Sequence, residues 1–217
     1  MNKRAIVAFL FAFATLIPYA KAQASGEARK NEVGLVIGAT VTPSQTLASS
    51  ISATPRTLTF NSSLALGAEF DHRLNTSERL AVLAGVDFLA SPLDVKLDQR
   101  PPSAIPEYAY VFLTPHIRVK FHPNGAVSPW LLFGGGYARY TESAPPTTIG
   151  FKVGTNTGTL ELGGGVDTGI VHRLWKIPLG FRFEVRDFYA GRPNYNLPLS
   201  GSMQHNVVFT GGLLIKF

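Results

Sequence analysis

Charged side chains spaced two residues apart are the most conspicuous chemical groups of this sequence. Arg182, Glu184 and Arg186 alternate with apolar residues, and Glu161 and Asp167 lie in the segment before them. Side chains two apart share one face of a β-strand, so these acids and bases would meet on neighbouring strands. Because buried charges are tolerated when they are paired, we interpret the set as a structural ion-pair network, with a narrow ion path or proton relay as the alternative. The predicted network comprises Glu69, Asp71, Arg79, Asp87, Arg118, Glu161, Asp167, Arg182, Glu184 and Arg186.

Catalytic, cofactor and metal chemistry has little support from the residue types. The chain has no cysteine, and its five histidines show no metal-ligand spacing. The histidines are His72, His116, His122, His172 and His205. Outer membrane lipid A deacylases place their serine nucleophile two residues after a histidine, and no histidine here has a serine at that position. We therefore predict no catalytic residue, cofactor or metal site, and keep a lipid A-modifying enzyme as an alternative.

Two glycine triplets, Gly134–Gly136 and Gly163–Gly165, could be mistaken for phosphate-binding loops. Neither has the complete spacing of a nucleotide-binding motif, and more strand pattern follows each. Glycines inside strands usually allow close strand approach or leave room for a bulky neighbour. We predict that role here.

Strand periodicity positions these groups. Apolar and polar residues alternate with period two, and glycine and proline interrupt helical patterns. We predict eight strands near residues 33–41, 60–71, 79–88, 107–121, 129–141, 159–172, 177–189 and 206–217. Each is about long enough to cross a membrane as a tilted strand. A bulge is expected at Pro115, and the pattern leaves the facing of the Trp130–Tyr140 strand open.

The connections between the predicted strands alternate between long and short. The first, third, fifth and seventh are long and the others are short turns, so the long ones gather at one end of the sheet. In transmembrane barrels the long loops face outside and the short turns face the periplasm. The loop tips best suited to binding are Asp94–Arg100, which is charged, and Arg192–Leu197, where Tyr195 is a candidate anchor.

The N-terminus predicts export. A basic start, an apolar run and the sequence Ala20-Lys21-Ala22 form a secretory signal peptide over residues 1–22. We expect an N-terminal periplasmic lead at 23–31 and a barrel domain at 32–217. Loss of the three signal-peptide cations lowers the net charge from +6 to +3, which removes most support for nucleic-acid binding.

Composition favours lipid, rather than a protein core, as the surrounding of the apolar faces. Charged residues make up 16% of the chain, and the opposite faces combine small residues with paired charges, as suits a confined lumen. Tyr and Phe gather near the predicted strand ends, as in the aromatic girdles of membrane barrels. An eight-stranded lumen is narrow enough for side chains to fill it. We therefore predict an all-β, eight-stranded, antiparallel up-and-down transmembrane barrel, with a soluble lipocalin-like carrier as a further alternative.

The signal peptide, the eight strands, the segments "SPWLLFGGGYARY" and "GFRFEVRDFYAG" and the aromatic last strand resemble the OmpA/opacity-type family of outer membrane β-barrels. The resemblance implies a location in the bacterial outer membrane. It also implies that the alternating last strand, with Phe209, Leu213, Ile215 and Phe217, is the signal read by the barrel assembly machinery. OmpA adds a peptidoglycan-binding domain after its barrel, and we do not expect this chain to be tethered directly to the cell wall.

The expected function is that of a monomeric, non-enzymatic outer membrane barrel with a structural or adhesive role. Expected partners are outer membrane lipid and lipopolysaccharide, the assembly machinery during insertion, and an extracellular ligand at the long loops. No nucleic acid is expected to bind.

Overall fold

The computed structural model describes residues 29–46, 57–93, 95–97, 108–142, 154–169, 171–174, 177–193 and 201–217. The predicted signal peptide and most of the predicted lead lie outside these residues, as do Tyr195 and most of the Asp94–Arg100 tip. No helix in this part of the chain is long and apolar enough to cross a membrane.

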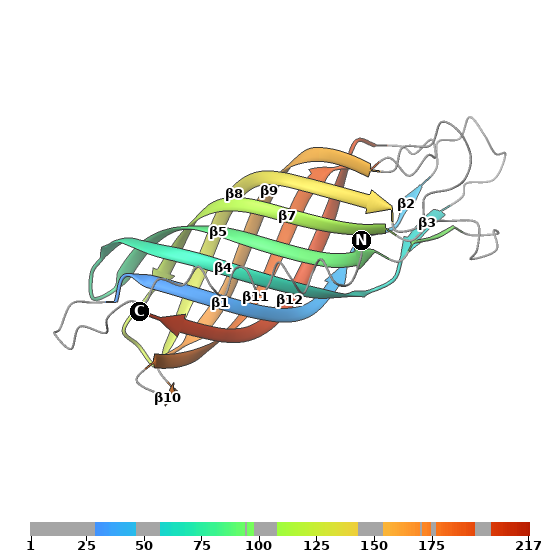
Figure 1. Cartoon of the computed structure of the whole chain (residues 1–217). Coiled ribbons are helices and arrows are strands. Elements are labelled where there is room, and N and C mark those ends of the chain that lie inside the picture. The colour runs from blue at the N-terminus through green and yellow to red at the C-terminus, as the bar shows by residue number, and fades with distance from the viewer. Residues whose placement is uncertain are drawn as a thin grey trace.

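Eight long strands form a closed antiparallel barrel, which Figure 1 shows with its strands tilted. They are β1 (Asn31–Val41), β4 (Ser63–Thr76), β5 (Leu80–Leu93), β7 (Tyr108–Phe121), β8 (Val127–Glu142), β9 (Gly154–Thr168), β11 (Ile177–Gly191) and β12 (Met203–Lys216). The predicted fold class and all eight predicted strands are confirmed. The alternating pattern succeeds because each strand has one face toward lipid and one toward the lumen.

Pairing between the first and last strands closes the barrel. Val33 lies opposite Ile215, and the register continues to Val41 opposite Val207. Beyond β12, Asn31 and Phe217 exchange two backbone hydrogen bonds of 2.9 Å. The C-terminal residue is therefore held by the barrel wall, and neither β1 nor β12 is left as a free edge.

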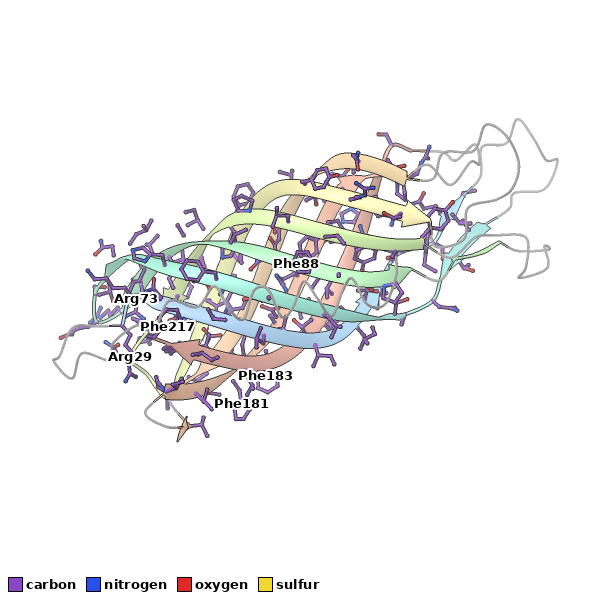
Figure 2. The ribbon with its side chains drawn as sticks, viewed as in Figure 1. Arg29, Arg73, Phe88, Phe181, Phe183 and Phe217 are labelled. Carbon is purple, nitrogen blue, oxygen red and sulfur yellow. The ribbon has the colours of Figure 1, made fainter. Side chains whose placement is uncertain are left out.

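The outer face of the barrel is apolar. Figure 2 shows Phe181 and Phe183 of β11 pointing away from the wall, and these side chains are 43% and 55% exposed. The same face carries Leu131 and Phe133 of β8 and Leu162 of β9, all exposed. The opposite face holds buried acids and bases. A soluble carrier would have the reverse arrangement, so this barrel is built to stand in lipid.

Short and long connections alternate as predicted. The short turns follow β4, β7 and β9, and the long connections follow β1, β5, β8 and β11. Figure 1 shows the C-terminus at the short-turn end of the barrel, with β2 and β3 beyond the other end.

A small second sheet stands at the long-connection end. It pairs β2 (Gln45–Thr46) with β3 (Thr57–Phe60), and β3 with β6 (Val95–Leu97), in the order β2-β3-β6. The strands come from the first and third connections. The start predicted for the second barrel strand at residue 60 is therefore wrong: β3 ends there and the barrel strand begins at Ser63.

The structure answers two questions about the barrel wall: where a bulge lies, and which way β8 faces. The bulge expected at Pro115 is wrong, because β5 pairs with β7 without a register shift and the offset between β7 and β8 is equal on both sides of Pro115. The register shifts instead in β4, between Arg73 and Asn75. The facing left open for β8 is now settled: Trp130 is buried in the lumen and Arg139 faces outward.

One further short strand, β10 (His172–Leu174), lies in the third short turn and pairs with the start of β11.

Candidate functional site

The lumen is filled by side chains from all eight barrel strands, and its charged part is the candidate functional site. At the short-turn end, Lys120 of β7 bridges two strands that are distant in sequence. Its Nζ lies 2.5 Å from Glu32 Oε2 on β1 and 2.6 Å from Asp167 Oδ2 on β9. Arg73 of β4 also reaches Glu32, with 3.3 Å between Nη2 and Oε1. Glu32, Lys120 and Asp167 are fully buried, so their ion pairs link β1, β7 and β9 across the lumen.

Two arginines stack against a tryptophan in the next layer. The guanidinium carbon of Arg118 lies 4.3 Å from the Trp130 ring centroid, and that of Arg182 lies 5.4 Å away. The indole nitrogen donates to Asp167 Oδ1 at 3.0 Å. Arg182 donates two further bonds to Asp167, from Nε at 2.8 Å and Nη2 at 2.9 Å, and both arginines donate to Glu69. A planar guanidinium suits this combination of stacking and forked hydrogen bonding.

Further from the short turns, one arginine is surrounded by four carboxylates. Nitrogens of the Arg186 guanidinium lie 2.8 Å from Glu184 Oε1, 3.1 Å from Asp87 Oδ2, 3.2 Å from Glu161 Oε1 and 3.3 Å from Glu69 Oε1. Every one of these side chains is buried. Acid therefore outnumbers base in this part of the lumen.

His116 of β7 joins the two charged layers. Its Nε2 donates to Asp71 Oδ1 at 2.8 Å, and its Nδ1 lies 3.1 Å from Asp87 Oδ2. Close by, Thr114 donates its hydroxyl hydrogen to Glu161 Oε2. These contacts link β4, β5, β7 and β9 across the lumen.

The structure brings together nine of the ten predicted network residues. The exception is Arg79, which is exposed in the turn before β5. Arg79 has the same parity as the lumen residue Asp87, but alternation applies only within a strand, and β5 begins at Leu80. The prediction that Arg79 lies in the lumen is therefore wrong.

Sequence reasoning left five residues out of this network: Glu32, Arg73, His116, Lys120 and Trp130. Alternation did place Lys120 and His116 on the inward face, so that signal was available. Glu32 precedes the predicted start of its strand, and Trp130 belongs to the strand whose facing was open. Only the barrel's cross-lumen geometry shows which partners they meet.

The glycine triplets create space, as predicted. A Cβ added at Gly165 would lie 2.6 Å from Trp130 Cζ2, and one at Gly134 would lie 2.9 Å from His116 Cβ. Both distances are far shorter than a normal contact. Glycine at these inward positions is what lets the large lumen side chains fit.

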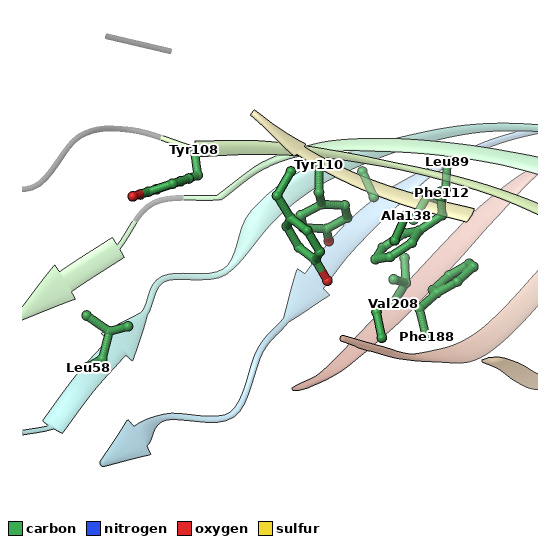
Figure 3. Packing of buried hydrophobic residues seen from close by; sticks show 11 residues of the cluster. Leu58, Leu89, Tyr108, Tyr110, Phe112, Ala138, Phe188 and Val208 are labelled. Atoms are coloured by element: carbon green, nitrogen blue, oxygen red, sulfur yellow. The ribbon is translucent and has the colours of Figure 1, made fainter. Parts of the chain in front are cut away.

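Aromatic rings fill the lumen on the other side of the Arg186 layer. Phe112 and Phe188 stack in parallel with ring centroids 4.4 Å apart, and Tyr110 and Tyr140 pack around Phe112. Figure 3 shows Tyr110, Phe112 and Phe188 within the barrel, and Leu58 on β3 of the small sheet. We call Tyr110, Phe112, Tyr140 and Phe188 the aromatic layer. It belongs to one buried cluster that includes Leu58 and Tyr108.

One acid–histidine pair lies on the outside of the barrel instead. His205 Nδ1 of β12 is 2.6 Å from Asp187 Oδ2 of β11, and the His205 ring packs on Tyr189 at 4.6 Å between centroids. A histidine oriented by an acid is part of a nucleophilic catalytic site, but such a site also needs a nucleophile. Within the described ranges, no serine or threonine hydroxyl is hydrogen-bonded to His205.

The predicted assembly residues line the outer face of β12. Phe209 and Leu213 are 49% and 43% exposed, and Ile215 and Phe217 are half-buried. Their role in assembly stays a prediction.

No protein-family model and no curated protein sequence matches the chain. Neisserial surface protein A is similar in structure, with a TM-score of 0.54, 14% identity, and coverage of 88% of this chain and 100% of that one. The outer membrane protein OprG from Pseudomonas aeruginosa gives 0.51 and 17%, over 88% of this chain and 98% of that one.

The outer membrane protease OmpT from Escherichia coli also matches, with a TM-score of 0.42 and 8% identity over 87% of this chain and 97% of that one. The likeness to Neisserial surface protein A and OprG confirms the resemblance to outer membrane barrels at the level of the fold. Together with the apolar outer face and the closed eight-stranded wall, it shows that the chain has the fold of an integral outer membrane barrel. Fold does not fix activity, so function has to be argued from the residues.

Proposed function

We propose that the protein is a non-enzymatic surface barrel whose work is to hold an extracellular platform for recognition. The platform is the β2-β3-β6 sheet together with the long connections that carry it. The observation that supports this role most directly is that two separate connections, after β1 and after β5, pair with each other beyond the barrel.

The platform is attached to the barrel through side chains. Leu58 of β3 is fully buried in the same cluster as Tyr108 and the aromatic layer, and Phe60 packs against that cluster. A loop that is anchored to a rigid scaffold presents a defined surface, and such loops commonly carry binding residues. The ligand would thus be met by an ordered surface at the outer end of the barrel.

The filled lumen supports a surface role over transport. Charged layers and the aromatic layer follow one another along the lumen axis, and the largest side chains in them are fully buried. Eight-stranded barrels of this kind have no room for a diffusion pore. Lipopolysaccharide around the wall and the assembly machinery acting on β12 are further proposed partners.

The test uses the whole protein displayed on bacteria that lack other adhesins. Retention would be measured on immobilised fibronectin, laminin and heparan sulfate. One variant replaces residues 43–62 with a four-residue Gly-Asn turn, which removes the platform. Its matched control shortens the connection between β8 and β9 at 144–152. We expect retention to fall at least tenfold in the first variant only, with both barrels still shifting on unboiled gels. Equal retention by both variants would contradict the proposal.

A conductance measurement provides a second arm. Purified wild-type protein in planar bilayers should show no stepwise conductance above that of empty membranes. Conductance that falls in the Glu184→Gln variant would overturn the surface role in favour of an ion path, because Glu184 lines the lumen.

A further inference from the structure

A buried histidine and two buried carboxylates converge in the middle of the lumen. Asp87 of β5, His116 of β7 and Glu161 of β9 each offer one ligand atom, and these atoms all lie within 4.8 Å of one another. The three side chains are at most 5% exposed. Two ligand atoms of a tetrahedral ion, each about 2.1 Å from it, lie about 3.4 Å apart, so binding one ion would require the separations within the triad to shorten by up to about 1.4 Å.

The hydrogen bonds around the triad orient its members as in a metal site. His116 donates from Nε2 to Asp71, which leaves Nδ1 as the nitrogen facing Asp87. Thr114 donates to one oxygen of Glu161. A metal-binding histidine usually donates its other ring nitrogen to a carboxylate in this way, and ligating carboxylates are themselves hydrogen-bonded.

Asp87 and His116 each have a buried polar atom without a hydrogen bond to the described residues. Asp87 Oδ1 is buried and makes no hydrogen bond to the part of the chain that the structure describes, and His116 Nδ1 makes none either. A buried carboxylate oxygen with no donor is costly. Both residues belong to the cluster that could take an ion.

The charge balance of the lumen points the same way. Among the described residues, seven buried carboxylates face four buried arginine or lysine side chains. Near the short turns the charges nearly balance, because Arg118, Lys120 and Arg182 share their acids with Arg73 at the rim. The excess lies around Arg186, the one guanidinium shared by Asp87, Glu161 and Glu184.

We propose that Asp87, His116 and Glu161 bind a divalent first-row transition-metal ion such as Zn²⁺ in the centre of the lumen. Imidazole nitrogen with carboxylate oxygen is a ligand set that Zn²⁺ accepts, and three protein ligands leave a position for water. Two positive charges there offset the acid excess around Arg186. The ion would link β5, β7 and β9 across the lumen. The proposed platform function does not require this ion.

The site is tested on the full barrel, refolded from urea into detergent with and without metal, because the aromatic layer closes the lumen above the triad. Co²⁺ serves as a spectroscopic probe, since a bound ion with a nitrogen ligand absorbs in the visible range. We expect one Co²⁺ per barrel, displaced by Zn²⁺, and a rise in the urea midpoint when Zn²⁺ is present. In His116→Gln and Asp87→Asn, affinity should fall at least tenfold.

Two matched controls separate the triad from other sites. Glu184→Gln removes a carboxylate that also contacts Arg186 but lies outside the triad, and it should keep Co²⁺ binding within about threefold. His205→Gln removes the exposed acid–histidine pair on the outer face and should leave the spectrum unchanged. Binding lost in His205→Gln but kept in His116→Gln would overturn the proposal.

Absence of one-to-one binding by the wild-type protein, refolded in either condition, would overturn the proposal as well. The wild-type spectrum and midpoint need no variant, so the result stands even where a lumen variant does not fold. Gel mobility without boiling shows which variants have folded.

Discussion

The half of the lumen near the short turns is filled by charged side chains, whereas the half near the long connections is filled by aromatic ones. In the charged half, Arg182 reaches Asp167 on β9 and Glu69 on β4 with hydrogen bonds of fixed direction. In the aromatic half, Phe112 and Phe188 meet by stacking. Both halves are buried, but charged hydrogen bonds hold one together and ring stacking holds the other.

The two halves should differ in how they tolerate amino-acid substitutions. Removing one member of a buried ion pair leaves an uncompensated charge, and this costs more than the pair itself contributes. Removing an aromatic ring leaves a cavity whose cost depends on how far the neighbours relax. The charged half should therefore respond to substitution in an all-or-none manner, and the aromatic half in a graded one.

The largest effect is expected for Arg182→Met. This change removes one cationic partner from Glu69, which keeps Arg118, and one from Asp167, which keeps Lys120. Breaking a buried pair costs about 3–5 kcal/mol. We expect no folded barrel, measured as loss of the unboiled gel shift and of refolding into vesicles. The matched control is Arg79→Met, which removes an exposed turn arginine and should change stability by less than about 0.5 kcal/mol. Equal behaviour of the two variants would contradict the distinction between halves.

A smaller but still large effect is expected for Phe112→Ala in the aromatic layer. The ring is fully buried and stacks on Phe188, and Phe→Ala changes in cores cost about 3–5 kcal/mol. The barrel should fold with a lowered urea midpoint. Phe183→Ala is the control, because that ring faces lipid and is 55% exposed. A greater loss in Phe183→Ala would show that the aromatic layer is not tightly packed.

Within the charged half, the inward and outward faces of β9 differ in how closely neighbouring atoms approach its glycines. A Cβ at Gly165 would meet Trp130 Cζ2 at 2.6 Å, whereas one at Gly164, its outward neighbour, would meet Leu131 Cδ2 at 3.3 Å. Gly165→Ala should therefore cost about 1–3 kcal/mol by overpacking, measured from the urea midpoint. Gly164→Ala should cost less, because the Leu131 side chain can move in lipid. The reverse order would contradict the close approach of Trp130 and of the Phe183 backbone oxygen to Gly165.

The smallest effect is expected where polar groups border the aromatic layer. Asn206 donates from Nδ2 to the Tyr140 hydroxyl at 3.3 Å and to the Phe188 carbonyl at 3.1 Å. Tyr140→Phe removes one of these acceptors and keeps the ring, so it should cost about 0.5–1.5 kcal/mol. The same midpoint measurement applies, with Phe112→Ala as the reference for loss of a ring. A cost as large as that of Phe112→Ala would mean that hydrogen bonds, and not packing, hold this half together.

Much of the wall was predictable because its rules are local. Alternation between lipid and lumen acts within each strand, so it predicted eight strands, the facing of seven of them and the closure of β12 on β1. It also placed Glu69, Glu184 and Arg186 in the lumen. The pattern failed where locality ends, at Arg79 in a turn and at residue 60, where β3 belongs to another sheet.

The sequence by itself determined the inward face of seven of the eight barrel strands, because the side-chain period of a strand needs no knowledge of its neighbours. Only the tertiary structure decided which of those residues meet. Arg182 and Glu69 are 113 residues apart in sequence, and Asp87, His116 and Glu161 come from three strands. Their contacts follow from the stagger between strands and the diameter of the closed wall, which are properties of the whole barrel.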